Sequence, residues 1–119
     1  MELLVNKSFF GKENCLKIQL NNEKECYFHF GIGKNNEWIW HKIKMNDIEL
    51  GEIIQVLQGK KPSVAFFHKI NGSDRQIWVN KKDKYFFIKI KELSKSLSEG
   101  EQEVLRILLE NIIWEMGKN

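Results

Sequence analysis

Residues 38–59, WIWHKIKMNDIELGEIIQVLQG, change from one hydrophobic period to another and decide the fold class. The first eight residues alternate between two sets, Ile39, His41, Ile43 and Met45 on one side and Trp38, Trp40, Lys42 and Lys44 on the other. This period of two predicts a half-buried strand. From Asn46 the spacing becomes helical, with apolar residues at Leu50, Ile53, Ile54 and Leu57. Asn46 and Glu49 fit a capping box and Gly59 fits a C-terminal stop, so the strand is expected to lead directly into a helix.

The same two periods extend over most of the chain. Alternation predicts strands over residues 15–20 and 26–32 before this stretch, and over 63–70, 75–80 and 85–91 after it. Turn-forming residues separate these strands at 21–24, 33–36, 71–73 (Asn71-Gly72-Ser73) and 81–83. A second helix is expected from Ser98, with Glu101 as capping partner, to Gly117. The order ββββ-α-βββ(β)-α predicts an α+β fold of two antiparallel meander sheets, each followed by a helix; residues 92–97 are too short for a clear eighth strand.

The apolar stripe of the second helix consists of Val104, Leu105, Leu108, Leu109, Ile112, Ile113 and Met116. Composition indicates one globular domain over residues 1–119, with 42% hydrophobic and 29% charged residues. No stretch is long and apolar enough for a membrane span, and the first seven residues lack the pattern of a signal peptide, so a cytoplasmic location is expected.

Two cysteines and three histidines offer little for metal or redox chemistry. Cys15 and Cys26 fall on opposite faces of neighbouring strands, so we expect reduced thiols and no disulfide. The histidines have no ligand spacing, and Gly31-Ile32-Gly33-Lys34 lacks the rest of a phosphate-binding loop. Neither a metal site, a cofactor nor an enzyme activity is expected.

Charge is unevenly distributed along the chain. Residues 60–95 contain nine lysines and one arginine against three acidic residues, a net charge of +7. Residues 96–119 contain five glutamates against two basic residues, a net charge of −3. A basic strand region beside an acidic helix indicates an anionic partner, and the competing interpretation is a solvated, lysine-rich surface.

Two strands carry aromatic residues and lysines together on one face. These rows are Trp38, Trp40, Lys42 and Lys44, and Tyr85, Phe87, Lys89 and Lys91. By the same alternation Tyr27, Phe67 and Trp78 could add to the surface. Aromatic rings stack on unpaired bases and ammonium groups neutralise phosphates, so the rows favour single-stranded nucleic acid. The competing interpretation is that the aromatic residues are buried between packed sheets.

Several segments, in order along the chain, resemble the Whirly family of single-stranded DNA-binding proteins, whose fold is shared by the kinetoplastid mitochondrial guide-RNA-binding proteins. These segments are residues 9–16 (FFGKENCL), 38–53 (WIWHKIKMNDIELGEI), 66–68 (Phe66-Phe67-His68) and 101–117. The resemblance covers most of residues 9–117.

The resemblance implies sheets that carry single strands with little sequence preference, and helices that gather four protomers into a ring. By position it implicates Gly11 and Lys12 in a glycine-lysine motif, with Phe10 where the family has a first lysine, and also Trp38, Lys42, Phe67 and His68. Lys17 and Arg75 complete the candidate nucleic-acid-binding residues. His68 has either a structural or a stacking role. Single-stranded DNA is the expected ligand, in strand protection, recombination, repair or transcription control; a single-stranded RNA-binding or annealing factor and a protein-interaction module are the alternatives.

Overall fold

The computed structural model describes residues 2–70 and 72–118, and in these ranges it has eight strands and two helices. They are β1 (Leu3–Phe10), β2 (Asn14–Asn21), β3 (Cys26–Lys34), β4 (Glu37–Met45), α1 (Asp47–Leu57), β5 (Ser63–Ile70), β6 (Ser73–Lys82), β7 (Tyr85–Ile90), β8 (Leu93–Leu97) and α2 (Glu99–Met116). This order confirms the predicted α+β fold, in which each meander sheet is followed by a helix.

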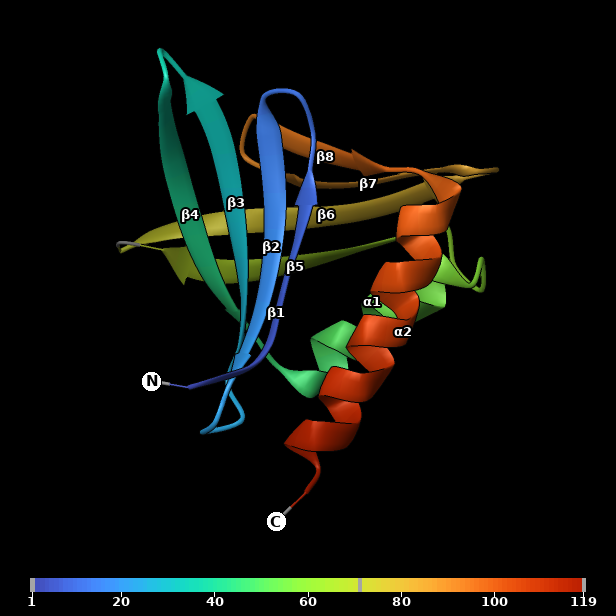
Figure 1. The fold of residues 1–119 in the computed structure, drawn as a ribbon. Coiled ribbons are helices and arrows are strands. Elements are labelled where there is room, and N and C mark those ends of the chain that lie inside the picture. Colours follow the sequence, from blue (N-terminus) through green and yellow to red (C-terminus); the bar gives the residue numbers. More distant parts are fainter. Residues whose placement is uncertain (1, 71, 119) are drawn as a thin grey trace.

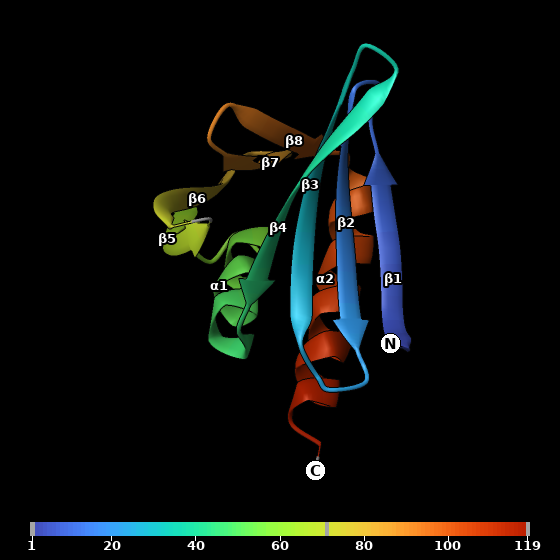
Figure 2. The ribbon, with the colours of Figure 1, turned by 90° about the vertical axis from the view of Figure 1, so that its left-hand side faces the viewer.

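The strands form two four-stranded antiparallel sheets, in the orders β1-β2-β3-β4 (sheet A) and β5-β6-β7-β8 (sheet B). In Figure 1 the strands of sheet A run across those of sheet B, and both helices lie on one side of sheet A. In Figure 2 sheet A lies in front and the helices lie behind it. The face of sheet A that points away from the helices is therefore open, and we call it the outer face of sheet A.

The opposite, inner faces of the two sheets enclose the core together with the helices. In sheet A the cross-strand row Ile18, Phe28 and Ile43 is almost completely buried. In sheet B the cross-strand partners Val79 and Ile88 on the inner face are equally buried. Burying side chains of this size contributes about 1.5–3 kcal/mol each, so alternation along the strands fixes which face of each sheet points outward.

Both helices begin as the sequence predicts. The Asn46 side chain accepts a hydrogen bond from the Glu49 backbone N–H at 2.8 Å, and the Glu49 carboxylate accepts from the Asn46 N–H at 2.9 Å. Ser98 and Glu101 form the same capping box at the start of α2. The helices pack against each other, and α1 ends before Gly59, whose φ of +75° is a conformation that glycine adopts readily.

Several details differ from the sequence-based expectations. Residues 93–97 form a complete eighth strand, β8. Lys91, expected at the end of the preceding strand, instead lies in the β7–β8 turn with φ of +51°. Ile39 and Val104, expected on buried faces, are exposed. Ile39 is near the start of β4, and the tip of the β3–β4 hairpin lies away from both helices (Figure 1). Asn71, expected in the β5–β6 turn, lies outside the described residues.

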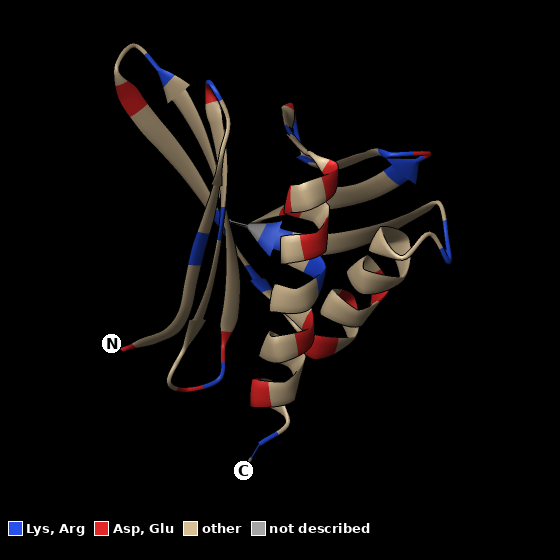
Figure 3. Ribbon diagram, turned by 45° about the vertical axis from the view of Figure 1, so that its right-hand side comes forward, with Lys and Arg blue, Asp and Glu red and all other residues tan. Residues whose placement is uncertain are grey.

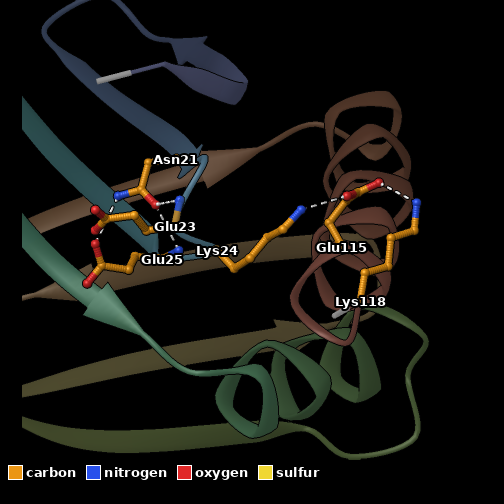
Figure 4. A network of polar contacts seen from close by, with 6 residues as sticks. All are labelled: Asn21, Glu23, Lys24, Glu25, Glu115 and Lys118. Atoms are coloured by element: carbon orange, nitrogen blue, oxygen red, sulfur yellow. Dashed lines mark hydrogen bonds and ion pairs between the residues drawn. The ribbon is translucent and has the colours of Figure 1, made fainter.

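A polar network fixes the β2–β3 turn and connects it to α2 (Figure 4). The Asn21 side-chain oxygen accepts hydrogen bonds from the backbone N–H groups of Glu23 and Glu25, both at 3.0 Å. Lys24, on the same turn, forms an ion pair of 3.2 Å with Glu115 of α2. This ion pair connects the β2–β3 turn of sheet A to the C-terminal end of α2.

Charge is divided between the helices and the strands. In Figure 3 acidic residues gather on α1 and α2, whereas lysine and arginine lie mostly on strands and turns.

No helix within the described part of the chain is long and apolar enough to cross a membrane.

Candidate nucleic-acid interface

Three cross-strand rows build the outer face of sheet A. They are Phe10–Cys15–Gly31–Trp40, Ser8–Lys17–His29–Lys42 and Asn6–Gln19–Tyr27–Lys44. Trp38 is the next outward residue of β4 beyond Trp40, opposite Gly33. The register therefore brings the predicted aromatic row of β4 together with Lys17 and Tyr27 from the two preceding strands.

Trp38 and Trp40 form a stacked pair that remains open to solvent. Their ring centroids are 5.7 Å apart with an interplanar angle of 24°, and the residues are 44% and 40% exposed. Gly31 makes room for the pair, because a Cβ atom there would lie only 2.7–2.9 Å from three carbons of the Trp40 ring. The two indoles thus form a stacked, exposed platform and are not core residues.

Lysine side chains flank these rings. The Lys17 ammonium lies 4.6 Å from the centroid of the Trp40 ring, and the Lys42 ammonium lies 4.1 Å from that of Tyr27. Such exposed cation–π contacts are worth about 0.5–1 kcal/mol. Within the described residues neither lysine has a carboxylate partner, so both charges are available to an anionic ligand.

His29 lies in the middle of the outer face, directly between Lys17 and Lys42 in the register. Burial is the largest cause that lowers the pKa of His29, and the two lysines lower it further. Its Nε2 atom is buried and has no hydrogen-bond partner within the described part of the chain. Burial and the two lysines therefore disfavour the charged imidazolium in the free protein.

Sheet B has an outer face of similar chemistry. Phe67, Trp78, Tyr85 and Phe87 are all exposed there, and the register places Trp78 opposite Lys89. The Lys89 ammonium is 5.8 Å from the centroid of the Trp78 ring. Both predicted aromatic rows thus lie on exposed surfaces, one on each sheet, and are not buried between the sheets.

Two candidate residues point away from this surface of sheet B. His68 and Arg75 are cross-strand partners in the register, and they alternate with Phe67 and Gln76 onto the inner face. The Nε2 atom of His68 lies 2.5 Å from the carboxylate of Glu49 at the start of α1. This contact fits the structural role of His68.

The remaining candidates lie at the margins. Phe10 is an exposed residue at the edge of sheet A, in the same row as Trp40, and Lys12 is exposed in the β1–β2 turn after Gly11. Lys44 forms an ion pair with Glu25 at 2.9 Å, which raises the pKa of Lys44 and lowers that of Glu25. Lys44 is therefore less available to a ligand than Lys17 or Lys42.

Sequence reasoning did not identify the two glycines of β3 as parts of the site, because glycine carries neither a charge nor a ring. Gly31 and Gly33 look like an incomplete phosphate loop in the sequence, but in the strand they face Trp40 and Trp38. A glycine pair spaced by two within a strand is the signal for such a close approach. His29 can be assigned to the outer face from alternation, but its place between two lysines depends on register.

Both thiols are free, as predicted, and the structure shows that both are buried. Burial is the largest cause that raises the pKa of Cys15, and it raises the pKa of Cys26 to about 12. Both thiols therefore remain protonated and unreactive near neutral pH.

No protein-family model matches the chain, and no curated protein matches it at a significant level.

Proposed function

We propose that this protein binds single-stranded nucleic acid, DNA in preference to RNA and with little sequence preference, by stacking bases on exposed rings and pairing phosphates with lysines. The exposed Trp38–Trp40 platform, with the Lys17 ammonium over the Trp40 ring and Lys42 in the adjacent row, is the observation that carries the proposal. Base stacking on an aromatic side chain is worth about 1–3 kcal/mol, and it requires bases that are not already stacked in a duplex.

Charge supports the same ligand. Residues 60–95 carry a net charge of +7, and on both sheets a lysine lies beside an exposed ring, Lys17 at Trp40 and Lys89 at Trp78. A single strand has a flexible backbone, so its phosphates can reach these ammonium groups along the surface. The roles we propose are protection of exposed strands, recombination, repair or transcription control, without enzyme activity. Two free thiols fit a reducing compartment, which we take to be the cytoplasm.

We further propose a homotetramer assembled through the helices, as the resemblance to the Whirly family implies. Val104, Ile107 and Trp114 of α2 are exposed apolar residues, and Trp114 is 70% exposed. Assembly through α2 would cover these residues and leave the outer faces of both sheets free for a bound strand.

A matched pair of substitutions in β4 tests the stacking. Trp40→Ala should weaken binding to labelled oligo-dT by roughly 5- to 150-fold, the equivalent of about 1–3 kcal/mol. Ile39→Ala, next to it but on the other face, should change the dissociation constant by less than about twofold. Circular dichroism checks that both variants fold, and Tyr85→Ala extends the test to sheet B. Equal affinities for Trp40→Ala and Ile39→Ala would count against stacking on the outer face of sheet A.

The ligand class needs its own comparison. Oligo-dT, oligo-U and a DNA duplex should bind in that order of affinity. Tighter binding of oligo-U would make the protein a single-stranded RNA binder. Absence of binding to all three, with the exposed rings intact, would favour a protein partner for the same surface.

A further inference from the structure

His29 occupies an unusual electrostatic position on the outer face of sheet A. The groups that face it are Lys17 from β2, Lys42 from β4 and Tyr27 on its own strand, while β1 contributes only Ser8 to the row. No carboxylate of the described residues belongs to this row. The imidazole therefore has a positive neighbour on each side and no negative one.

The neutral imidazole is also incompletely satisfied. Its Nε2 atom is buried and makes no hydrogen bond within the described residues. Leaving a buried polar atom unpaired is costly, so such an atom in a native structure calls for a partner, for instance an ion. Burial together with the two lysines lowers the pKa of His29, so both its charge state and its missing partner depend on what covers the row.

We propose that His29 takes up a proton from solution when a single strand binds and becomes a third cationic phosphate contact, between Lys17 and Lys42. This inference rests on the proposed function. Phosphates paired with the two lysines replace a positive environment by a nearly neutral or negative one. That change favours the imidazolium, and the imidazolium can donate a hydrogen bond from Nε2 to a phosphate oxygen.

The geometry permits this exchange. Neighbouring strands are about 4.8 Å apart, so the three side chains of the row cover about 10 Å of surface. In the free protein the two lysines lie over the rings of Trp40 and Tyr27. Moving these ammonium groups onto phosphates removes them from the rings, which become free for bases, and places the phosphates on either side of His29 in the row.

Proton uptake makes binding depend on pH. Because the bound state holds more protons than the free state, affinity must rise as pH falls, by at most tenfold per pH unit for one proton. Affinity for oligo-dT should therefore increase several-fold between about pH 8 and about pH 5.5, the range in which histidine titrates. Thymine has no group that titrates in this range, so the change reports on the protein.

The test combines calorimetry with two matched variants. Titration of the native chain with oligo-dT, in two buffers of different ionisation enthalpy at constant ionic strength, gives the number of protons taken up and needs no substitution. His29→Gln should lose the pH dependence of oligo-dT affinity and the proton uptake. His41→Gln removes a histidine of the neighbouring strand that lies opposite Phe30 on the inner face, and it should keep the pH dependence.

The outcomes separate the two levels of the proposal. Binding of oligo-dT without proton uptake, or pH dependence that survives in His29→Gln, would overturn the role of His29 and leave single-strand binding intact. Absence of oligo-dT binding at every pH would overturn both. Proton uptake that is present in the native chain and in His41→Gln but absent in His29→Gln is the expected result.

Discussion

Replacing Gly31 by alanine should weaken single-strand binding without weakening the fold. A Cβ atom at this position would lie 2.7 Å from one carbon of the Trp40 ring and 2.9 Å from two others. Carbon atoms in contact are normally about 3.5–4.0 Å apart. The ring must therefore move by roughly 1 Å, and it can do so because Trp40 is exposed.

Two opposing terms determine the effect on stability. Alanine is favoured over glycine in a strand by roughly 0.5–1 kcal/mol. Disturbing the stacked pair of Trp38 and Trp40 costs up to about 0.5–1.5 kcal/mol. Since these terms are similar in size, the free energy of unfolding should change by less than about 1 kcal/mol in either direction.

Binding has no such compensation. Displacing the platform removes part of the about 1–3 kcal/mol that a stacked base contributes. We expect a loss of about 1–2 kcal/mol, or roughly 5- to 30-fold in the dissociation constant for oligo-dT. Fluorescence anisotropy measures the affinity, and urea denaturation measures the stability of the same preparation.

Gly33→Ala is the matched control. It adds the same methyl group two residues along β3, where the nearest atoms to a Cβ are 3.7–3.8 Å away, an ordinary contact. This variant should bind within about twofold of the native chain. Native affinity in Gly31→Ala, or an equal loss in Gly33→Ala, would refute the argument that the position of the Trp40 ring determines binding.

Three further predictions concern pH, a turn and assembly. Because burial and the flanking lysines lower the pKa of His29, this residue binds its proton less readily in the folded chain than in the unfolded chain below about pH 6.5. Stability to urea should therefore fall as pH drops from about 7 to about 5. His29→Gln should flatten this slope, and an unchanged slope would contradict the role of His29. Asn21→Ala should lower the unfolding free energy by about 1–3 kcal/mol because two backbone N–H groups lose their acceptor. Asn22→Ala, at the exposed neighbouring position, should lower it by less than about 0.5 kcal/mol. Similar losses in both variants would contradict the role of Asn21 in the turn. Trp114→Lys should convert the proposed tetramer to smaller species in light scattering, and an unaltered mass would place the assembly interface elsewhere.

The sequence was sufficient for the architecture because its hydrophobic period changes cleanly at each boundary. The change at Asn46 and the capping residues of both helices specify where strands give way to helices, and the structure reproduces them. Strand β8 was the exception. Its middle residue, Lys95, is a buried lysine between two leucines on the inner face, so the usual apolar alternation was interrupted in an already short segment.

The site was predictable in its chemistry but only partly in its geometry. Alternation placed Trp38, Trp40, Tyr85 and Phe87 on outward faces, but it could not show whether a second layer covered them. That depends on where the helices pack, which is a tertiary property. The cross-strand position of His29 depends on register, which the turns and the packing of the core determine together.

The salt dependence of affinity is the sharpest test of whether this protein binds single-stranded nucleic acid through phosphate contacts. Labelled oligo-dT, oligo-U and a DNA duplex are titrated with the protein at two salt concentrations and followed by fluorescence anisotropy. We expect tight binding to the single strands and weak binding to the duplex, with log affinity falling by about 0.7 per phosphate contact for each tenfold rise in salt. Absence of single-strand binding at low salt, or an affinity that salt does not change, would contradict the account.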